Sequence, residues 1–131
     1  MGKENRRFPR VKSHLKIGYE FVKWDEKHLD NMKDPDFAHI YDISVSGIGL
    51  FNLKALNASI LKKLENGKLK VRLALYFPDK ELPLITFARL IWSNLNMGEH
   101  HRYGFVFLDV SESFFLSVSE FVSKEIKKEI R

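Results

Sequence analysis

The fold is decided by VKSHLKIGYEFVKW, residues 11–24, in which two kinds of side chain alternate. The odd positions from Val11 to Phe21 are mostly apolar, whereas the even positions between them are mostly charged or polar. Successive side chains of an extended chain point to opposite faces, so a period of two is typical of a strand with one buried face. We therefore expect a strand over residues 11–24.

Five further stretches have β-type patterns: residues 37–44, 48–53, 68–77, 84–93 and 103–110. Turn residues separate them, and Val45-Ser46-Gly47 forms a tight turn between the first two. A short helix is expected over residues 56–64, closed by Asn66-Gly67, whereas residues 25–36 form a long polar loop. Six strands with short connections predict a mainly all-β fold, an antiparallel meander or a Greek-key barrel.

The hydrophobic period changes after residue 111. From there the apolar residues fall at helical spacing: Phe114, Phe115, Val118, Phe121, Val122, Ile126 and Ile130. Charged residues such as Lys124 and Lys127 occupy the opposite side. This pattern predicts an amphipathic α-helix over residues 112–131 that packs on the barrel or caps it.

The composition fits one domain over residues 1–131, with 44% hydrophobic and 30% charged residues. The chain has no cysteine, which excludes disulfides, thiolate metal sites and a cysteine nucleophile, and favours a cytoplasmic location. No apolar run is long enough to cross a bilayer, so membrane insertion is not expected. The histidines, His100-His101 included, show no metal-site spacing, and no acid–base or nucleophile motif is present. We expect neither catalysis nor a metal or cofactor.

Positive charge is concentrated at the N-terminal end of the chain. The formal net charge is +5, and residues 1–16 alone carry six basic side chains against one acid. Residues 20–36 are the reverse, with six acids against three lysines. A concentrated basic patch attracts an anionic ligand or partner, although a solvated basic tail remains the alternative.

The basic patch includes ENRRFPRV, residues 4–11. Pro9 lacks an N–H and biases Phe8 towards an extended conformation, so a helix is not expected here. In an extended chain Arg6 and Arg10 point to the same side, about 13 Å apart, and can hold one elongated anion at two points. Guanidinium groups bind phosphate and the guanine O6/N7 edge, but two arginines at this spacing are not specific by themselves.

A second candidate site is Asp42-Ile43-Ser44-Val45-Ser46-Gly47. In a strand Asp42 and Ser44 share one face, and a carboxylate suits a ligand edge with two N–H donors, such as N1/N2 of guanine. Gly47 provides either a positive φ or a point where backbone can approach a ligand without a Cβ in between. Ordinary turn chemistry is the alternative explanation for these residue types.

Taken together with two later stretches, these motifs resemble the PilZ domain family. The stretches are Leu-Ile-Trp-Ser and Tyr-Gly-Phe-Val-Phe, and the likeness runs from about residue 5 to residue 122. Members of that family are six-stranded antiparallel β-barrels with a C-terminal helix, and they act as bacterial receptors for cyclic di-GMP. The family's two motifs, Arg-x-x-x-Arg and Asp/Asn-x-Ser-x-x-Gly, fall on Arg6, Arg10, Asp42, Ser44 and Gly47.

The resemblance implies that residues 1–10 form a flexible arm that folds over cyclic di-GMP, with Arg7 assisting, while the strand-end motif holds a guanine. It also implies an output through conformational change, read by a partner protein supplied in trans. Asn5 stands where many members carry an arginine or a large side chain, so one or two bound ligands remain open. The acidic loop over residues 25–36 is either a docking surface for a partner or an ordinary insertion.

Two other functions remain as alternatives. One is a PilZ-type adaptor that has lost ligand binding, and the other is a small basic barrel that binds nucleic acid. Nucleic-acid binding calls for exposed aromatic rings in a basic groove. The alternating pattern places strand aromatics, including Trp92, Phe105 and Phe107, on the inward face, which argues against it.

Overall fold

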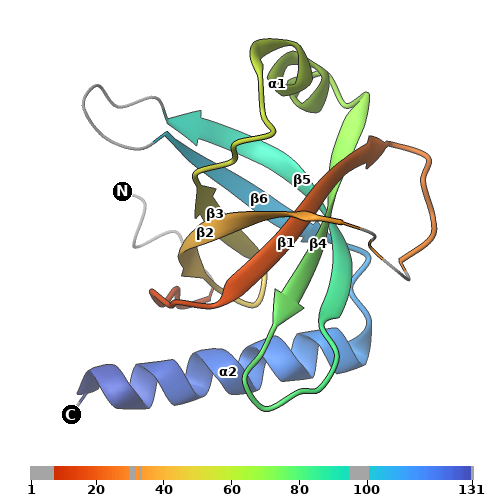
Figure 1. The fold of residues 1–131 in the computed structure, drawn as a ribbon. Coiled ribbons are helices and arrows are strands. Elements are labelled where there is room, and N and C mark those ends of the chain that lie inside the picture. The colour runs from red at the N-terminus through yellow and green to blue at the C-terminus, as the bar shows by residue number, and fades with distance from the viewer. Residues whose placement is uncertain (1–7, 30–31, 33, 95–100, 131) are drawn as a thin grey trace.

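The computed structural model describes residues 8–29, 32, 34–94 and 101–130. Within these residues six antiparallel strands close into a barrel in the order β1-β2-β3-β6-β5-β4 (Figure 1). The elements are β1 Lys16–Lys23, β2 Asp36–Ile43, β3 Gly47–Phe51, α1 Ala58–Glu65, β4 Leu69–Tyr76, β5 Leu84–Asn94, β6 Arg102–Leu108 and α2 Glu112–Ile130. The predicted six-stranded barrel with a C-terminal helix is confirmed.

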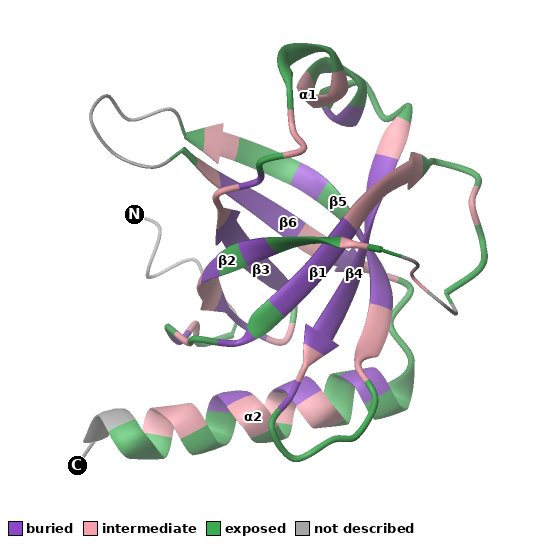
Figure 2. Ribbon diagram, in the orientation of Figure 1, coloured by how far each residue is buried: buried purple, intermediate pink, exposed green. Residues whose placement is uncertain are grey.

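The barrel interior is filled by the apolar side chains that alternate along the strands. Figure 2 shows the buried stretches gathered on the strands. Ile17, Ile48 and Leu73 are fully buried, and each such side chain stabilises the fold by about 1.5–3 kcal/mol. Tyr19 is also fully buried, and its hydroxyl oxygen accepts a hydrogen bond of 2.9 Å from the Ala55 backbone N–H. Burial raises the pKa of the Tyr19 hydroxyl.

The first strand begins later than predicted. β1 starts at Lys16, and residues 12–15 belong to no strand. Val11 alone bridges to Ile43, through two backbone hydrogen bonds of 2.9 Å. The alternation nevertheless extends back to Val11 because Val11 and Leu15 are both buried. A period of two therefore reports burial, and it does not by itself report a partner strand.

Two β-bulges, on β2 and on β5, change which side chains face the barrel interior. One lies between Ile40 and Asp42 on β2, and the other lies between Leu90 and Trp92 on β5. A bulge inserts one extra residue, so the following side chain changes face. The assignment of Trp92 to the core is therefore wrong: its side chain is 43% exposed, whereas Phe105 and Phe107 are buried as predicted.

The two helices cover the barrel from different ends (Figure 1). The short helix α1 is capped by Asn57, whose side chain accepts a 2.9 Å hydrogen bond from the Ile60 N–H. The long helix α2 buries Phe114, Val118 and Val122 against the barrel. Both helices were expected from the sequence. Among the described helices, none has the length and apolar character needed to cross a bilayer.

Candidate functional site

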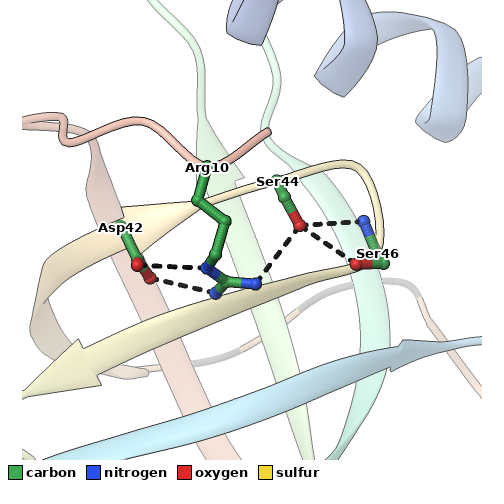
Figure 3. Close-up of polar contacts among 4 residues, drawn as sticks. All are labelled: Arg10, Asp42, Ser44 and Ser46. Atoms are coloured by element: carbon green, nitrogen blue, oxygen red, sulfur yellow. Dashed lines mark hydrogen bonds and ion pairs between the residues drawn. The ribbon is translucent and has the colours of Figure 1, made fainter. Parts of the chain in front are cut away.

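Arg10 joins the end of β2 to the segment that precedes β1 (Figure 3). Its Nε and Nη2 donate to the two carboxylate oxygens of Asp42 at 3.0 and 2.9 Å, and its Nη1 donates to Ser44 Oγ at 3.3 Å. The two hydroxyls of Ser44 and Ser46 lie 3.0 Å apart, and the Ser46 N–H also donates to Ser44 Oγ. We call Arg10, Asp42, Ser44 and Ser46 the Arg10 cluster.

Local structure explains why these side chains meet. The Val11–Ile43 bridge fixes the backbone next to Arg10 beside the end of β2. The β2 bulge turns Asp42 to the outer face, where its side chain is 14% exposed and that of Arg10 is 19% exposed. Paired in this partly buried setting, the bidentate contact is stronger than a surface ion pair. Arg10 and Asp42 are 32 residues apart in sequence, so only the fold brings them together.

Ser46 was not among the predicted site residues. It lies in the turn between β2 and β3, and its hydroxyl completes the hydrogen bonding of Ser44, which is fully buried. The alternation of two serines after Asp42 was the signal in the sequence, because such hydroxyls commonly bond within a turn.

The structure gives Gly47 a role in strand packing and contradicts one of the two reasons considered, a positive φ. Among the described glycines, Gly67 has a positive φ, of 75°, and Gly47 does not. A Cβ on Gly47 would lie 2.3 Å from the carbonyl oxygen of Phe105. Gly47 therefore allows β3 to approach β6 closely, and the close approach is to a neighbouring strand.

Two further glycines arrange a row of side chains across four strands. Asp42 pairs with Gly49, Gly49 with Gly104, and Gly104 with Trp92, on β2, β3, β6 and β5. A Cβ on Gly49 would lie 2.6 Å from Asp42 Oδ1, and one on Gly104 would lie 2.2 Å from the Trp92 indole. The carboxylate and the indole therefore lie over neighbouring strands, on the same outer face. We call these four residues the glycine row.

The glycine row was missed from the sequence as a site. Its signal was present, because a glycine inside a strand marks a close approach of another group. Which group approaches depends on the register between strands that are distant in sequence, and the sequence does not show that register.

Two cations lie over the ring of Tyr41, the neighbour of Asp42 in β2. The Arg102 guanidinium lies 4.0 Å from the centre of the Tyr41 ring, and Lys12 Nζ lies 5.5 Å from it. Tyr41 directly precedes Asp42. The surface that adjoins the carboxylate is therefore positively charged, as binding of a phosphate-bearing ligand requires.

Three residues discussed for the arm, Asn5, Arg6 and Arg7, lie outside the described residues, as does His100. The acidic loop after β1 is anchored to the barrel through Glu26, whose carboxylate lies 3.4 Å from Arg72 Nη2. The pKa of Glu26 is lowered, mainly by the His28 backbone N–H and further by Arg72. In the described part of the chain, no group of three or more potential metal-ligating side chains lies together.

Comparison with known proteins places these features in context. The family model for the PilZ domain matches residues 4–122. Among curated proteins no match is found. The solved structure of the Bacillus subtilis inhibitor of motility MotI/DgrA has a TM-score of 0.66 at 15% identity, covering 96% of this chain. The chain spans about half of MotI/DgrA, 51% of its length.

Two other solved structures are complexes with c-di-GMP. The PilZ domain of YcgR from Escherichia coli has a TM-score of 0.55 at 15% identity, with 95% of this chain and 94% of that chain covered. PlzA from Borreliella burgdorferi has a TM-score of 0.54 at 14% identity, with 99% of this chain and 56% of that chain covered. At these identities the likeness shows a shared fold.

Proposed function

The chain belongs to the PilZ domain family, and from this premise we propose that it is a receptor for cyclic di-GMP that captures the ligand without catalysis. The observation that carries the proposal is the Arg10 cluster. Arg10 meets Asp42 and Ser44, residues 32 and 34 positions away, on the outer face of the barrel. The PilZ structures of YcgR and PlzA, complexes with c-di-GMP, support the same ligand for this fold.

Each group of the cluster complements one part of this ligand. The two oxygens of Asp42 fit the N1/N2 donor edge of a guanine, and Ser44 adds a hydroxyl. The guanidinium of Arg10 fits a phosphate or the O6/N7 edge of a guanine. Ligand binding then exchanges the Arg10–Asp42 contact for contacts of both residues with cyclic di-GMP, and Arg6 and Arg7 add charge from the arm.

The glycine row extends the proposed site beyond the two motifs. The Trp92 indole lies over Gly104 of β6, and the Asp42 carboxylate covers Gly49 on the neighbouring strand β3. Its ring is 43% exposed and offers a stacking surface beside an acceptor for the guanine edge. Trp92 thereby joins Arg10, Asp42, Ser44 and Gly47 among the residues of the proposed site.

The described end of the arm lines one pocket together with the C-terminal helix, which provides a route for the output. Phe8 and Pro9 line a pocket of about 150 Å³ together with Val45 of the β2–β3 turn and residues of α2, among them Phe115. A movement of Arg10 towards the ligand would shift Phe8 and Pro9 and so change the shape of this pocket. We expect this change at α2 to create or hide a surface for a partner protein in trans.

Isothermal titration calorimetry with cyclic di-GMP tests the proposal. We expect wild-type protein to bind and Arg10→Ala to bind at least about 30-fold more weakly, since hydrogen bonds to charged groups contribute about 1.5–3 kcal/mol. Lys63→Ala on α1 is the control, because it removes an exposed positive charge away from the cluster. Unchanged affinity in Arg10→Ala would contradict the assigned site.

The same titration separates the alternatives. A wild-type protein that releases no heat with cyclic di-GMP is the ligand-free adaptor. Binding of arbitrary oligonucleotides with steep salt dependence indicates the nucleic-acid barrel. The inward placement of aromatics does not exclude that barrel, because Trp24, Phe37 and Trp92 are each at least 40% exposed.

A further inference from the structure

A second surface lies between residues 12–16 and β2, at the end of the β1–β2 pairing. It is an open groove of about 770 Å³. Its lining comes from four parts of the chain: residues 12–16, residues 37–41, Phe51 and α2. The residues the argument uses are Lys12, Lys16, Phe37, Tyr41, Glu125 and Lys128. We call it the basic groove.

The groove exists because the strand ladder is interrupted. β1 pairs with β2 from Lys16–His39 onward, and Val11 bridges Ile43 further along. Between these two connections, residues 12–15 belong to no strand and separate from β2. The C-terminal half of α2 closes one side of the gap, through Glu125 and Lys128.

The lysines of the groove are held over aromatic rings. Lys16 Nζ lies 4.3 Å from the centre of the Phe37 ring and 5.4 Å from that of Tyr76. Lys12 Nζ lies 5.5 Å from the Tyr41 ring, which also carries the Arg102 guanidinium. Cation–π contacts of this kind fix the position of the ammonium groups and reduce the entropy that a partner must remove on binding.

The charge of the lining is one-sided. Lys12, Lys16 and Lys128 are exposed, and the one acidic lining residue, Glu125, is paired with Lys128 at 3.1 Å. Phe37 leaves 44% of its surface exposed beside Lys16. The groove therefore combines fixed positive charges with an unburied apolar ring.

We propose that the basic groove docks an acidic, extended segment of a partner protein. Its carboxylates meet Lys12 and Lys16, and one of its apolar side chains covers Phe37. Lys16 lies over the Phe37 ring and Arg102 over the Tyr41 ring. A stacked base needs a free ring face, whereas an apolar side chain needs only the exposed part of Phe37, so a peptide fits better than a nucleic acid. Within the chain's own acidic loop, Glu26 is paired with Arg72 of β4.

This inference goes beyond the proposed ligand binding and does not depend on it. The groove and the Arg10 cluster share no residue, although Lys12 and Tyr41 of the groove also belong to the positively charged surface beside Asp42. They are nevertheless neighbours in the chain. Lys12 lies two residues after Arg10, and Tyr41 directly precedes Asp42. Occupation of one surface is therefore expected to affect the other.

The test is an NMR titration of the full chain, without cyclic di-GMP, using the capped peptide Asp-Glu-Phe-Asp-Glu-Phe-Asp-Glu as probe. We expect amide shifts confined to residues 12–16 and 37–41 and to the C-terminal turns of α2. The double variant Lys12→Glu/Lys16→Glu should weaken binding at least about tenfold, since opposed like charges disfavour association. Lys62→Glu/Lys63→Glu on α1 makes the same change of net charge and should alter the affinity less than about twofold.

Three results would overturn the docking site. The first is absence of binding, and the second is equal weakening in both double variants, which indicates net charge alone. The third is tighter binding in the groove by an octamer of deoxythymidine than by the peptide, which makes it a nucleic-acid surface. Phe37→Ser removes the ring without changing the charge. It should weaken peptide binding at a specific site and leave a diffuse charge effect unchanged. A failure here leaves the cyclic di-GMP titration unchanged, so the two proposals are tested independently.

Discussion

Two arginine–carboxylate clusters lie on this barrel, and they are built in opposite ways. In one, Arg10 binds Asp42 and Ser44 from a segment outside the strands. In the other, Arg72 of β4 pairs with Glu20 of β1 and lies 3.4 Å from Glu26. We call the latter group the Arg72 cluster. Both arginine side chains are mostly buried, 19% exposed for Arg10 and 11% for Arg72.

The difference lies in what holds each arginine. Arg72 and Glu20 are direct partners in the β1–β4 ladder, so the ladder keeps the two side chains opposite one another as long as the barrel is closed. Arg10 is attached to β2 by the single Val11–Ile43 bridge, so it can leave Asp42 while the six strands stay paired. The same pair of chemical groups therefore serves as a structural clamp in one place and as an exchangeable contact in the other.

The largest expected effect is on stability, in the Arg72 cluster. Arg72→Leu should lower the free energy of unfolding by about 2–3 kcal/mol, because it leaves Glu20 and Glu26 without their cation in a partly buried setting. Arg10→Leu should lower it by about 1–2 kcal/mol, because Arg10 lies outside the strands and its loss opens the Asp42 carboxylate to water. Urea unfolding followed by circular dichroism measures both. Equal losses in the two variants would remove the distinction between the clusters.

The next effect is on ligand affinity, in the Arg10 cluster. Asp42→Ala should raise the Kd for cyclic di-GMP by about 30-fold, since it removes the acceptors proposed for a guanine edge, about 2 kcal/mol. Glu20→Ala is the matched control, because it removes a carboxylate that is also paired with an arginine. It should destabilise the protein and change the Kd less than about twofold. Calorimetry measures the Kd of both variants. A larger rise in Kd for Glu20→Ala than for Asp42→Ala would contradict the assignment of ligand binding to the Arg10 cluster.

A smaller effect on ligand affinity is expected from a substitution at Gly49, over which the Asp42 carboxylate lies. A Cβ on Gly49 would lie 2.6 Å from Asp42 Oδ1, so Gly49→Ala must displace the carboxylate. We expect a loss of affinity of about tenfold, comparable to one weakened charge-assisted contact. Gly18→Ala is the control in β1, where the nearest atoms belong to Pro35 at 3.4 Å. If both variants bind equally well, the position of Asp42 does not determine affinity.

Much of the barrel could be predicted because burial repeats every second residue along each strand. The bulges could not be predicted, since an extra residue is recognised only against the partner strand. The error at Trp92 follows directly: after the β5 bulge its side chain points outwards. The start of β1 was placed too early for the related reason that Val11 and Leu15 are buried without belonging to a strand.

The site was predictable to a similar extent. The spacing of Asp42 and Ser44 indicated a shared face, and both contact Arg10. The pairing of Gly49 with Gly104 was not accessible, because it joins strands far apart in the chain. The ligand-binding roles of Arg10, Asp42, Ser44 and Gly47, and those of Arg6 and Arg7, stay predictions until the titrations are done.

The smallest expected effect is on the affinity of a tryptophan variant. The chain has two tryptophans, and one lies near each cluster. Trp92 belongs to the glycine row, whereas Trp24 lies 5.7 Å from Lys70 Nζ, on β4 beside Arg72. Their exposed fractions are nearly equal, 43% and 40%, so unequal responses to the ligand reflect position. We expect Trp92→Phe to bind cyclic di-GMP about threefold more weakly, since a smaller ring keeps part of the stacking.

The fluorescence of the same two variants locates the ligand. In Trp24→Phe the remaining Trp92 should change its emission when cyclic di-GMP is added, because a guanine stacks on or beside the indole. In Trp92→Phe the remaining Trp24 should not respond, because the ladder holds the Arg72 cluster in place whether or not Arg10 moves. An emission change that persists in Trp92→Phe would contradict this interpretation. It would place the ligand, or a movement caused by it, near the Arg72 cluster.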